Sequence, residues 1–140
     1  MATREIFADT AGWANYFVRS ETFHVRSKDL LFRAKLDGTR VVTTNYVLGE
    51  LVSLLTSPLR VPRPLLITTL QAIRSASWVT LVYIDSDLDR QAWTLLDTRP
   101  DREWSLVDCA SFAVMQQRGI VEALTSDRHF EQAGFVRLLK

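Results

Sequence analysis

Hydrophobic and polar positions follow two different periods along the chain, and stretches of the two kinds alternate. Short apolar runs predict strands at residues 5–8, 41–42, 78–84, 123–125 and 135–139. Apolar residues spaced three and four apart predict helices over residues 11–18, 21–36, 46–56, 65–76, 85–96, 106–118 and 127–133. Because strands alternate with helices, we expect an α/β fold in which a mostly parallel central sheet carries helices on both faces.

Glycine and proline positions agree with this order of elements. Gly38, Gly119 and Gly134 each stand between a predicted helix and an apolar strand, where helices commonly end in a left-handed residue. The prolines within residues 57–64 mark a turn between two helices that is too short to be a domain linker. With no internal repeat, residues 1–140 are predicted to form a single domain.

Composition narrows the class of protein. Hydrophobic residues make up 47% and charged residues 24% of the chain, which is typical of a folded globular protein. No apolar run reaches the roughly 18 residues that span a bilayer, and the amino terminus does not resemble a signal peptide, so we expect a cytoplasmic protein without membrane contact. Cys109 is the single cysteine. It excludes an internal disulfide and a zinc site built on paired cysteines, and we interpret it as a small buried hydrophobe.

Four acidic residues stand against apolar sequence: Asp9, Glu50, Asp108 and Asp127. Asp9 and Asp127 follow predicted strands, Glu50 interrupts an apolar helix, and Asp108 lies in the first turn of another helix. Each residue also has an explanation that needs no ligand. Asp9 and Asp127 could be helix N-caps, and Asp108 could form a capping box with Ser105. Glu50 could lie at a solvent-exposed edge. Because α/β sheets bind ligands beyond the carboxyl ends of their strands, we expect the four to converge there.

Four converging carboxylates predict a bound divalent cation. Their mutual repulsion would otherwise raise their pKa values. Oxygen ligands select Mg²⁺ or Mn²⁺ and not zinc. His24 and His129 have no cysteine or histidine at ligand spacing, so neither is given a metal role. A carboxylate cluster with such a cation suits hydrolysis of a phosphodiester by a metal-activated water.

The sequence around the four acids has a recognisable pattern, carried by residues 7–11, 43–50, 104–112 and 124–130, the last followed by Gly134-Phe135. In their order, their spacing and the length of chain they cover, these stretches resemble the PIN-domain ribonucleases, a family that includes the VapC-type toxins of bacterial toxin–antitoxin pairs. The resemblance extends from the first predicted strand to the last. It implies a single PIN-like nuclease domain.

The resemblance also implies roles for particular residues. Asp9, Glu50, Asp108 and Asp127 would be the catalytic and metal-binding acids, and Thr10 and Ser105 would support the site with their hydroxyls. The chain has one acid directly at the fourth position, with Glu131 a turn later. The family further implies Mg²⁺ or Mn²⁺ as cofactor, RNA as substrate and a homodimer. A toxin would also have a VapB-like antitoxin that blocks the pocket, with an arginine among the carboxylates.

The distribution of charge is uneven, although the formal net charge is only +1. Residues 19–74 contain nine basic and four acidic side chains. Among the basic ones, Arg33, Lys35, Arg60 and Arg63 are candidates for contact with an RNA backbone. Ordinary solvated helix faces are the alternative explanation.

The main prediction is a metal-dependent endoribonuclease, the toxin of a type II toxin–antitoxin pair. One alternative is a stand-alone PIN-domain nuclease that processes RNA. A second is a phospho-acceptor receiver domain, which has a similar length and an acidic Mg²⁺ pocket; it would require paired acids after the first strand, where Ala8 precedes Asp9, and a lysine near Asp127. A third is a domain that binds RNA or a protein through a vestigial site.

Overall fold

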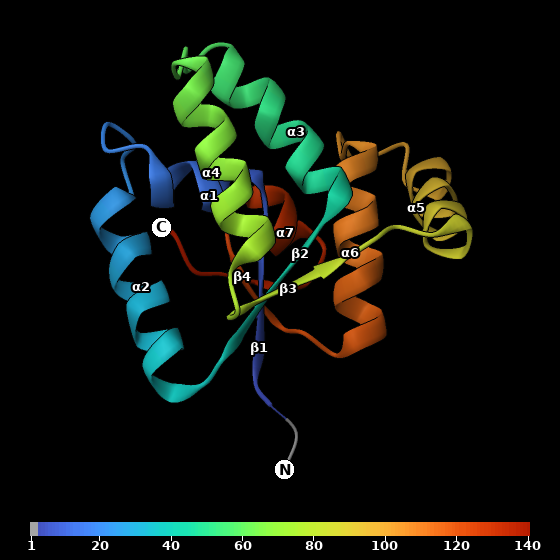
Figure 1. The fold of residues 1–140 in the computed structure, drawn as a ribbon. Coiled ribbons are helices and arrows are strands. Elements are labelled where there is room, and N and C mark those ends of the chain that lie inside the picture. The colour runs from blue at the N-terminus through green and yellow to red at the C-terminus, as the bar shows by residue number, and fades with distance from the viewer. Residues whose placement is uncertain (1–2) are drawn as a thin grey trace.

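A five-stranded parallel sheet forms the centre of the protein (Figure 1). A computed structural model describes residues 3–140. The strands follow the spatial order β3-β2-β1-β4-β5, and every neighbouring pair is parallel. Their bounds are Glu5–Ala8 (β1), Arg40–Thr44 (β2), Val79–Val82 (β3), Glu122–Leu124 (β4) and Val136–Arg137 (β5). The predicted α/β class is confirmed, and the sheet of the described residues is parallel throughout.

Helices cover both faces of the sheet. Their bounds are Thr10–Phe17 (α1), His24–Asp37 (α2), Asn45–Thr56 (α3), Arg63–Ser75 (α4), Ser86–Thr98 (α5), Leu106–Arg118 (α6) and Arg128–Gln132 (α7). From β1 the chain adds β2 and then β3 on one side of β1. It then crosses back and adds β4 and β5 on the other side. Right-handed crossovers therefore place the two sets of helices on opposite faces, as α2 and α4 against α5 and α6 show in Figure 1. No helix in residues 3–140 is long and apolar enough to cross a membrane.

The change of direction creates a crevice at the carboxyl edge of the sheet. Between β1 and β4 the chain leaves toward opposite faces, into α1 on one side and α7 on the other. Such a switch point leaves space beyond the strand ends, and it is where open α/β sheets bind ligands. The residues that follow β1 and β4 thus lie in the position that the sequence analysis assigned to the acids.

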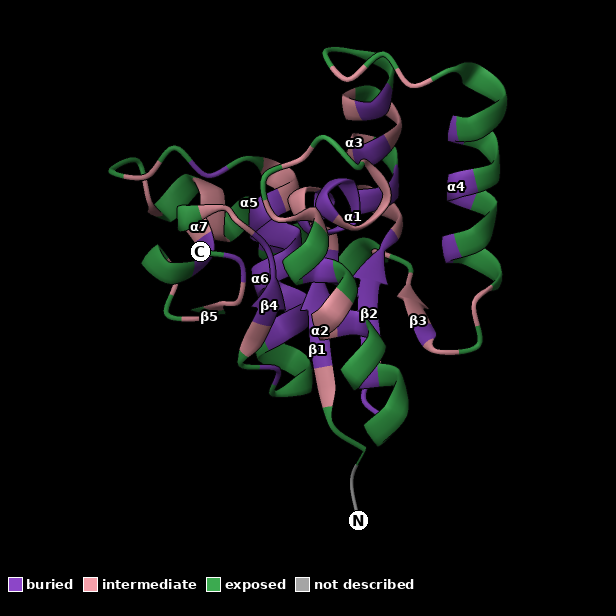
Figure 2. Ribbon diagram, turned by 90° about the vertical axis from the view of Figure 1, so that its left-hand side faces the viewer, coloured by how far each residue is buried: buried purple, intermediate pink, exposed green. Residues whose placement is uncertain are grey.

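The core is continuous across the central strands. Phe7 and Ala8 of β1 and Leu124 of β4 are fully buried, as Figure 2 shows for the central strands as a group. The fully buried Trp13 of α1 donates a hydrogen bond from Nε1 to Thr43 Oγ1 at 3.1 Å, and this hydroxyl in turn donates to the Ala8 carbonyl at 2.9 Å. These bonds fix the first turns of α1 against the ends of β1 and β2.

Gly12 lets α1 approach β4 unusually closely. A Cβ atom at this position would lie 1.9 Å from the carbonyl oxygen of Leu124, a backbone atom that cannot move aside. A glycine is thus required by space here and not by backbone conformation. The close approach brings Asp9, three residues earlier, beside the residue that ends β4.

Several element boundaries differ by one to three residues from the sequence analysis, among them the start of α2 and the extent of the last strand. Helix α2 begins at His24 and not at residue 21, because the Phe23 amide donates to Asn15 Oδ1 at 2.9 Å. The last strand covers residues 136–137 instead of 135–139. The amides of Leu138 and Leu139 still donate to the Ala123 and Thr125 carbonyls, both at 3.0 Å, so the pairing continues beyond the regular strand.

Candidate active site

Asp9 lies directly after β1 and has both carboxylate oxygens engaged. Oδ1 accepts a hydrogen bond from the Gly12 amide at 2.8 Å and caps α1, and Oδ2 accepts from Thr125 Oγ1 at 2.7 Å. Burial raises the pKa of Asp9 to about 7, against the two hydrogen bonds, and the charges of Asp127 and Asp108 raise it further. The N-cap alternative is therefore correct for one oxygen, while the other points toward the end of β4.

Glu50 is connected to this end of the sheet through Thr10. The Thr10 hydroxyl, buried in the first turn of α1, donates a short hydrogen bond to Glu50 Oε1 in the second turn of α3. Glu50 itself is half-buried, which falls between the buried and exposed alternatives of the sequence analysis. The hydroxyl of Thr10, the residue that follows Asp9, thus orients the Glu50 carboxylate.

Asp108 is held at the start of α6 by a capping box. Its amide donates to Ser105 Oγ at 3.0 Å, and its Oδ2 accepts from the Ser105 amide at 3.1 Å. The side chain is buried, and burial is the main cause that raises its pKa; the charge of Asp127 adds to this, while the Ser105 amide and His129 oppose it. The local alternative for Asp108 is confirmed, and it fixes the direction of the carboxylate.

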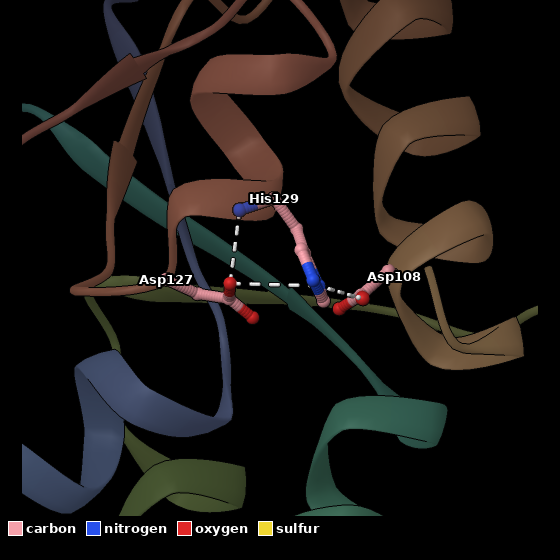
Figure 3. A group of neighbouring side chains, drawn as sticks. All are labelled: Asp108, Asp127 and His129. Carbon is pink, nitrogen blue, oxygen red and sulfur yellow. Dashed lines mark hydrogen bonds and ion pairs between the residues drawn. The ribbon is translucent and has the colours of Figure 1, made fainter. Parts of the chain in front are cut away.

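Asp127 and His129 complete a compact group with Asp108 (Figure 3). His129 Nδ1 lies 2.8 Å from Asp108 Oδ2 and 3.5 Å from Asp127 Oδ1. Asp127 Oδ1 also accepts from the His129 amide at 2.9 Å. One ligand atom from each of the three residues lies within 4.8 Å of the others, so they can hold a metal ion. We call Asp108, Asp127 and His129 the acidic cluster.

Thr125 joins the acidic cluster to Asp9. Its hydroxyl donates to Asp9 Oδ2 and accepts from the Asp127 amide at 2.9 Å. The residue is fully buried at the end of β4, so the positions of both acids depend on the sheet. The structure thus brings Asp9, Asp108 and Asp127 together, and it attaches Glu50 through Thr10.

Two polar residues of the site were missed by the sequence analysis. His129 was given no metal role, although its imidazole lies between two carboxylates. Thr125 was read only as part of a strand. The available signal was their spacing, one residue on either side of the Ser126-Asp127-Arg128 turn that follows β4, at the sheet edge where ligands bind.

The arrangement fits a hard divalent cation. Carboxylates provide most of the donor atoms, and burial raises the pKa of the Asp9 carboxyl to about 7. A cation at this edge would relieve both the burial penalty and the repulsion from Asp108 and Asp127. The chemistry that such a donor set supports is activation of water against a phosphodiester.

The basic residues predicted to contact RNA lie in two different places. Arg33 lines a cavity at the amino edge of the sheet with Arg4 and Glu122, away from the acidic cluster. Lys35 Nζ lies 4.1 Å from the centroid of the Trp78 ring, just before β3, and therefore also belongs to that edge. Arg60 and Arg63 are exposed at the turn of the α3–α4 hairpin, which projects past the carboxyl edge in Figures 1 and 2.

The fold is that of a PIN domain. The chain belongs to the PIN domain family, whose model matches residues 6–136. It is 36% identical over 133 residues to the 23S rRNA-specific endonuclease VapC20 of Mycobacterium tuberculosis, in strains CDC 1551 / Oshkosh and ATCC 25618 / H37Rv. The match covers 95% of this chain and 97% of that protein.

A solved structure agrees with this assignment. The crystal structure of Mycobacterium tuberculosis VapC20, a sarcin–ricin loop cleaving toxin, matches with a TM-score of 0.86 at 36% identity. The superposition covers 96% of this chain and 99% of that one. The resemblance to VapC-type PIN-domain proteins and the single α/β PIN domain are confirmed.

Proposed function

We propose that the protein is a metal-dependent endoribonuclease that hydrolyses phosphodiester bonds in RNA and acts as the toxin of a type II toxin–antitoxin pair. The observation that carries the proposal is the gathering of Asp9, Asp108 and Asp127 at the switch point of the sheet, joined by the Thr125 hydroxyl. The similarity to VapC20 over nearly the whole chain supports 23S rRNA, and within it the sarcin–ricin loop, as the substrate.

We assign a catalytic, metal-binding or supporting role to each residue of the site. Asp9, Glu50, Asp108 and Asp127 are the proposed catalytic and metal-binding acids. Thr10 holds the Glu50 carboxylate and Ser105 holds that of Asp108. His129 Nδ1 contacts Asp108 Oδ2, the oxygen that also accepts from the Ser105 amide, and so helps to orient this carboxylate.

The proposed cofactor is Mg²⁺ or Mn²⁺. Bound at these carboxylates, the ion would lower the pKa of a coordinated water and neutralise the phosphate charge. A donor set of several carboxylates with a single imidazole favours these ions over zinc. At neutral pH the carboxyl of Asp9, with a pKa of about 7, is partly protonated, so binding of the cation would release a proton there.

Cleavage of a synthetic RNA hairpin that carries the sarcin–ricin loop sequence tests the proposal. We expect the purified chain to cut it in Mg²⁺ or Mn²⁺ and not in excess EDTA. Asp9→Asn should lower the rate by at least about a hundredfold, because it removes a charge from the site itself. Asp97→Asn, the same substitution at an exposed position of α5, is the matched control and should cleave normally. Cleavage that survives in EDTA or in Asp9→Asn would contradict the proposal.

The proposal extends to partners and location. A VapB-like antitoxin would cover the carboxylates, and the toxin would form a homodimer. Because 23S rRNA lies in the cytoplasm, the protein would act there. Expression of the chain alone should arrest bacterial growth, and co-expression of a short open reading frame next to its gene should relieve the arrest; growth without arrest would favour a stand-alone nuclease.

A further inference from the structure

A polar cavity opens directly beside the acidic cluster. Its volume is about 360 Å³, and it lies between α7 and the loop that joins α5 to α6. Two members of the cluster, Asp127 and His129, form one wall. The other lining residues are Asp101, Arg102, Glu103, Arg128 and Gln132. A group bound in this cavity would therefore be next to whatever occupies the cluster.

The walls of the cavity are fixed to each other. Trp104, near the end of the α5–α6 loop, donates from Nε1 to Gln132 Oε1 at the end of α7, at 3.1 Å. The Trp104 ring is buried and packs edge-on against Phe112 of α6, with ring centroids 5.1 Å apart. The loop and α7 thus form one preorganised pocket.

Arg102 lines this pocket, and its guanidinium is not hydrogen-bonded to a carboxylate of the described residues. Its Nε is buried and has no hydrogen-bond partner among the described residues. The nearest carboxylate oxygen, Asp101 Oδ2, lies 3.8 Å away, beyond hydrogen-bond distance. Asp101 is instead held by both nitrogens of the Arg99 fork, at 3.0 and 2.9 Å. Arg99 thereby neutralises the acid that would otherwise compete for Arg102.

We propose that this cavity binds a phosphate of the RNA backbone that neighbours the scissile one, and that Arg102 is the residue that holds it, with Arg128 at the exposed rim. The planar guanidinium fork matches two phosphate oxygens, and Arg102 lines the cavity without a carboxylate of the described residues at hydrogen-bond distance, so its guanidinium can bind an anion there. The inference deepens the proposed function and rests on it, since it assigns a cationic contact for the substrate beside the carboxylates of the site.

RNA binding without cleavage tests the subsite. In an Asp9→Asn background with Mg²⁺ present, we would measure fluorescence anisotropy of a labelled sarcin–ricin hairpin across a salt series. Adding Arg102→Ala should weaken binding about tenfold, the loss expected for one charge-assisted hydrogen bond. It should also reduce the slope of log affinity against log salt by about 0.7 to 0.9. Arg102→Lys should keep the slope but lose affinity, because the point charge remains and the fork does not.

Arg74→Ala is the matched control, since Arg74 lies in the last turn of α4, which leads to β3 at the amino edge of the sheet. If Arg102→Ala binds as tightly as Arg74→Ala while the wild-type chain cleaves the hairpin, the subsite is wrong and the proposed function stands. If the wild type does not cleave but binding depends on Arg102, the activity is wrong and the subsite stands. If no variant binds RNA, both are wrong.

Discussion

At the scale of single residues, Asp9 both caps a helix and belongs to the proposed metal site. One oxygen caps α1 and the other accepts from Thr125, so the carboxylate is held by neutral donors alone. Its burial and the charges of Asp127 and Asp108 oppose ionisation, and its pKa is about 7. Without a cation, the negative charge of ionised Asp9 is therefore unfavourable at neutral pH, and a bound divalent cation would stabilise it.

This leads to a prediction for stability against pH in EDTA. The folded-state pKa of Asp9 is above the unfolded value, so its contribution is fully present below about pH 4 and is lost as pH rises through 7. Between pH 5 and pH 8, the wild type should lose more free energy of unfolding than Asp9→Asn, which keeps the cap but cannot ionise. Urea unfolding at both pH values measures this difference.

Added Mn²⁺ provides the control for that experiment. If the cation binds the ionised carboxylate, it should stabilise the wild type more at pH 8 than at pH 5, and Asp9→Asn much less at either pH. A difference between the two proteins that does not change with pH would show that Asp9 is not held in its neutral form.

Single residues also show how far sequence reasoning reaches into the site. The four acids could be selected because each interrupts apolar sequence at a predicted strand end or helix start. Thr125 and His129 were not selected, because a threonine in a strand and a lone histidine acquire their roles from what the fold places next to them. The Arg102 guanidinium is a similar case, since its free donor depends on Arg99 engaging Asp101.

At the scale of elements, the packing of α1 on β4 determines the spacing of the acids. Gly12 is the contact point, because a Cβ there would meet the Leu124 carbonyl at 1.9 Å. Gly49 in α3 is a matched case without such a contact, since a Cβ there would have nothing within 4 Å and the residue is exposed.

We therefore expect opposite effects from the same substitution. Gly12→Ala should lower the free energy of unfolding by at least about 2 kcal/mol, because the helix must move away from the sheet. Gly49→Ala should raise it by about 0.5 to 1 kcal/mol through helix propensity. Urea unfolding measures the free energy of unfolding of both variants. If Gly12→Ala destabilises the protein so strongly that only this variant fails to accumulate in soluble form, the prediction is also confirmed. Equal stability of the two variants would contradict the packing described for α1.

Element boundaries were predictable where local chemistry sets them. The ends of α2 and α6 at Gly38 and Gly119 follow from left-handed caps, and the structure has both residues at positive φ. The start of α2 was not predictable, because a side chain from α1, Asn15, takes the Phe23 amide. The extent of β5 was not predictable either, because periodicity does not reveal where regular strand pairing ends.

At the scale of the whole molecule, strand order and the crevice between β1 and β4 are the features that no local pattern contained. The alternation of strands and helices predicted a parallel sheet, but not the full order of its strands, with β3 at an edge. The resemblance to PIN domains supported the convergence of the acids that the α/β pattern had predicted.

The buried thiol of Cys109 offers a measurement of global opening. Burial, with a contribution from Asp108, raises its pKa to about 11, which at pH 8 leaves more than about a hundredfold less thiolate than an ordinary cysteine has. A disulfide reagent should therefore label no thiol in the native protein within minutes and one per chain in urea. Rapid labelling of the native protein would show that α6 opens locally.

The hydroxyl of Thr125 has a consequence for how the site can fail. It carries one hydrogen, which it gives to Asp9, and it accepts from the Asp127 amide on its own oxygen. The Thr125 oxygen, directly after β4, thus sets the spacing between Asp9 and Asp127. A slip of β4 by one residue would turn this atom to the opposite face of the sheet. We therefore expect activity to depend on the register of the sheet. Substitutions in β4 that contact no acid should then still be able to abolish activity.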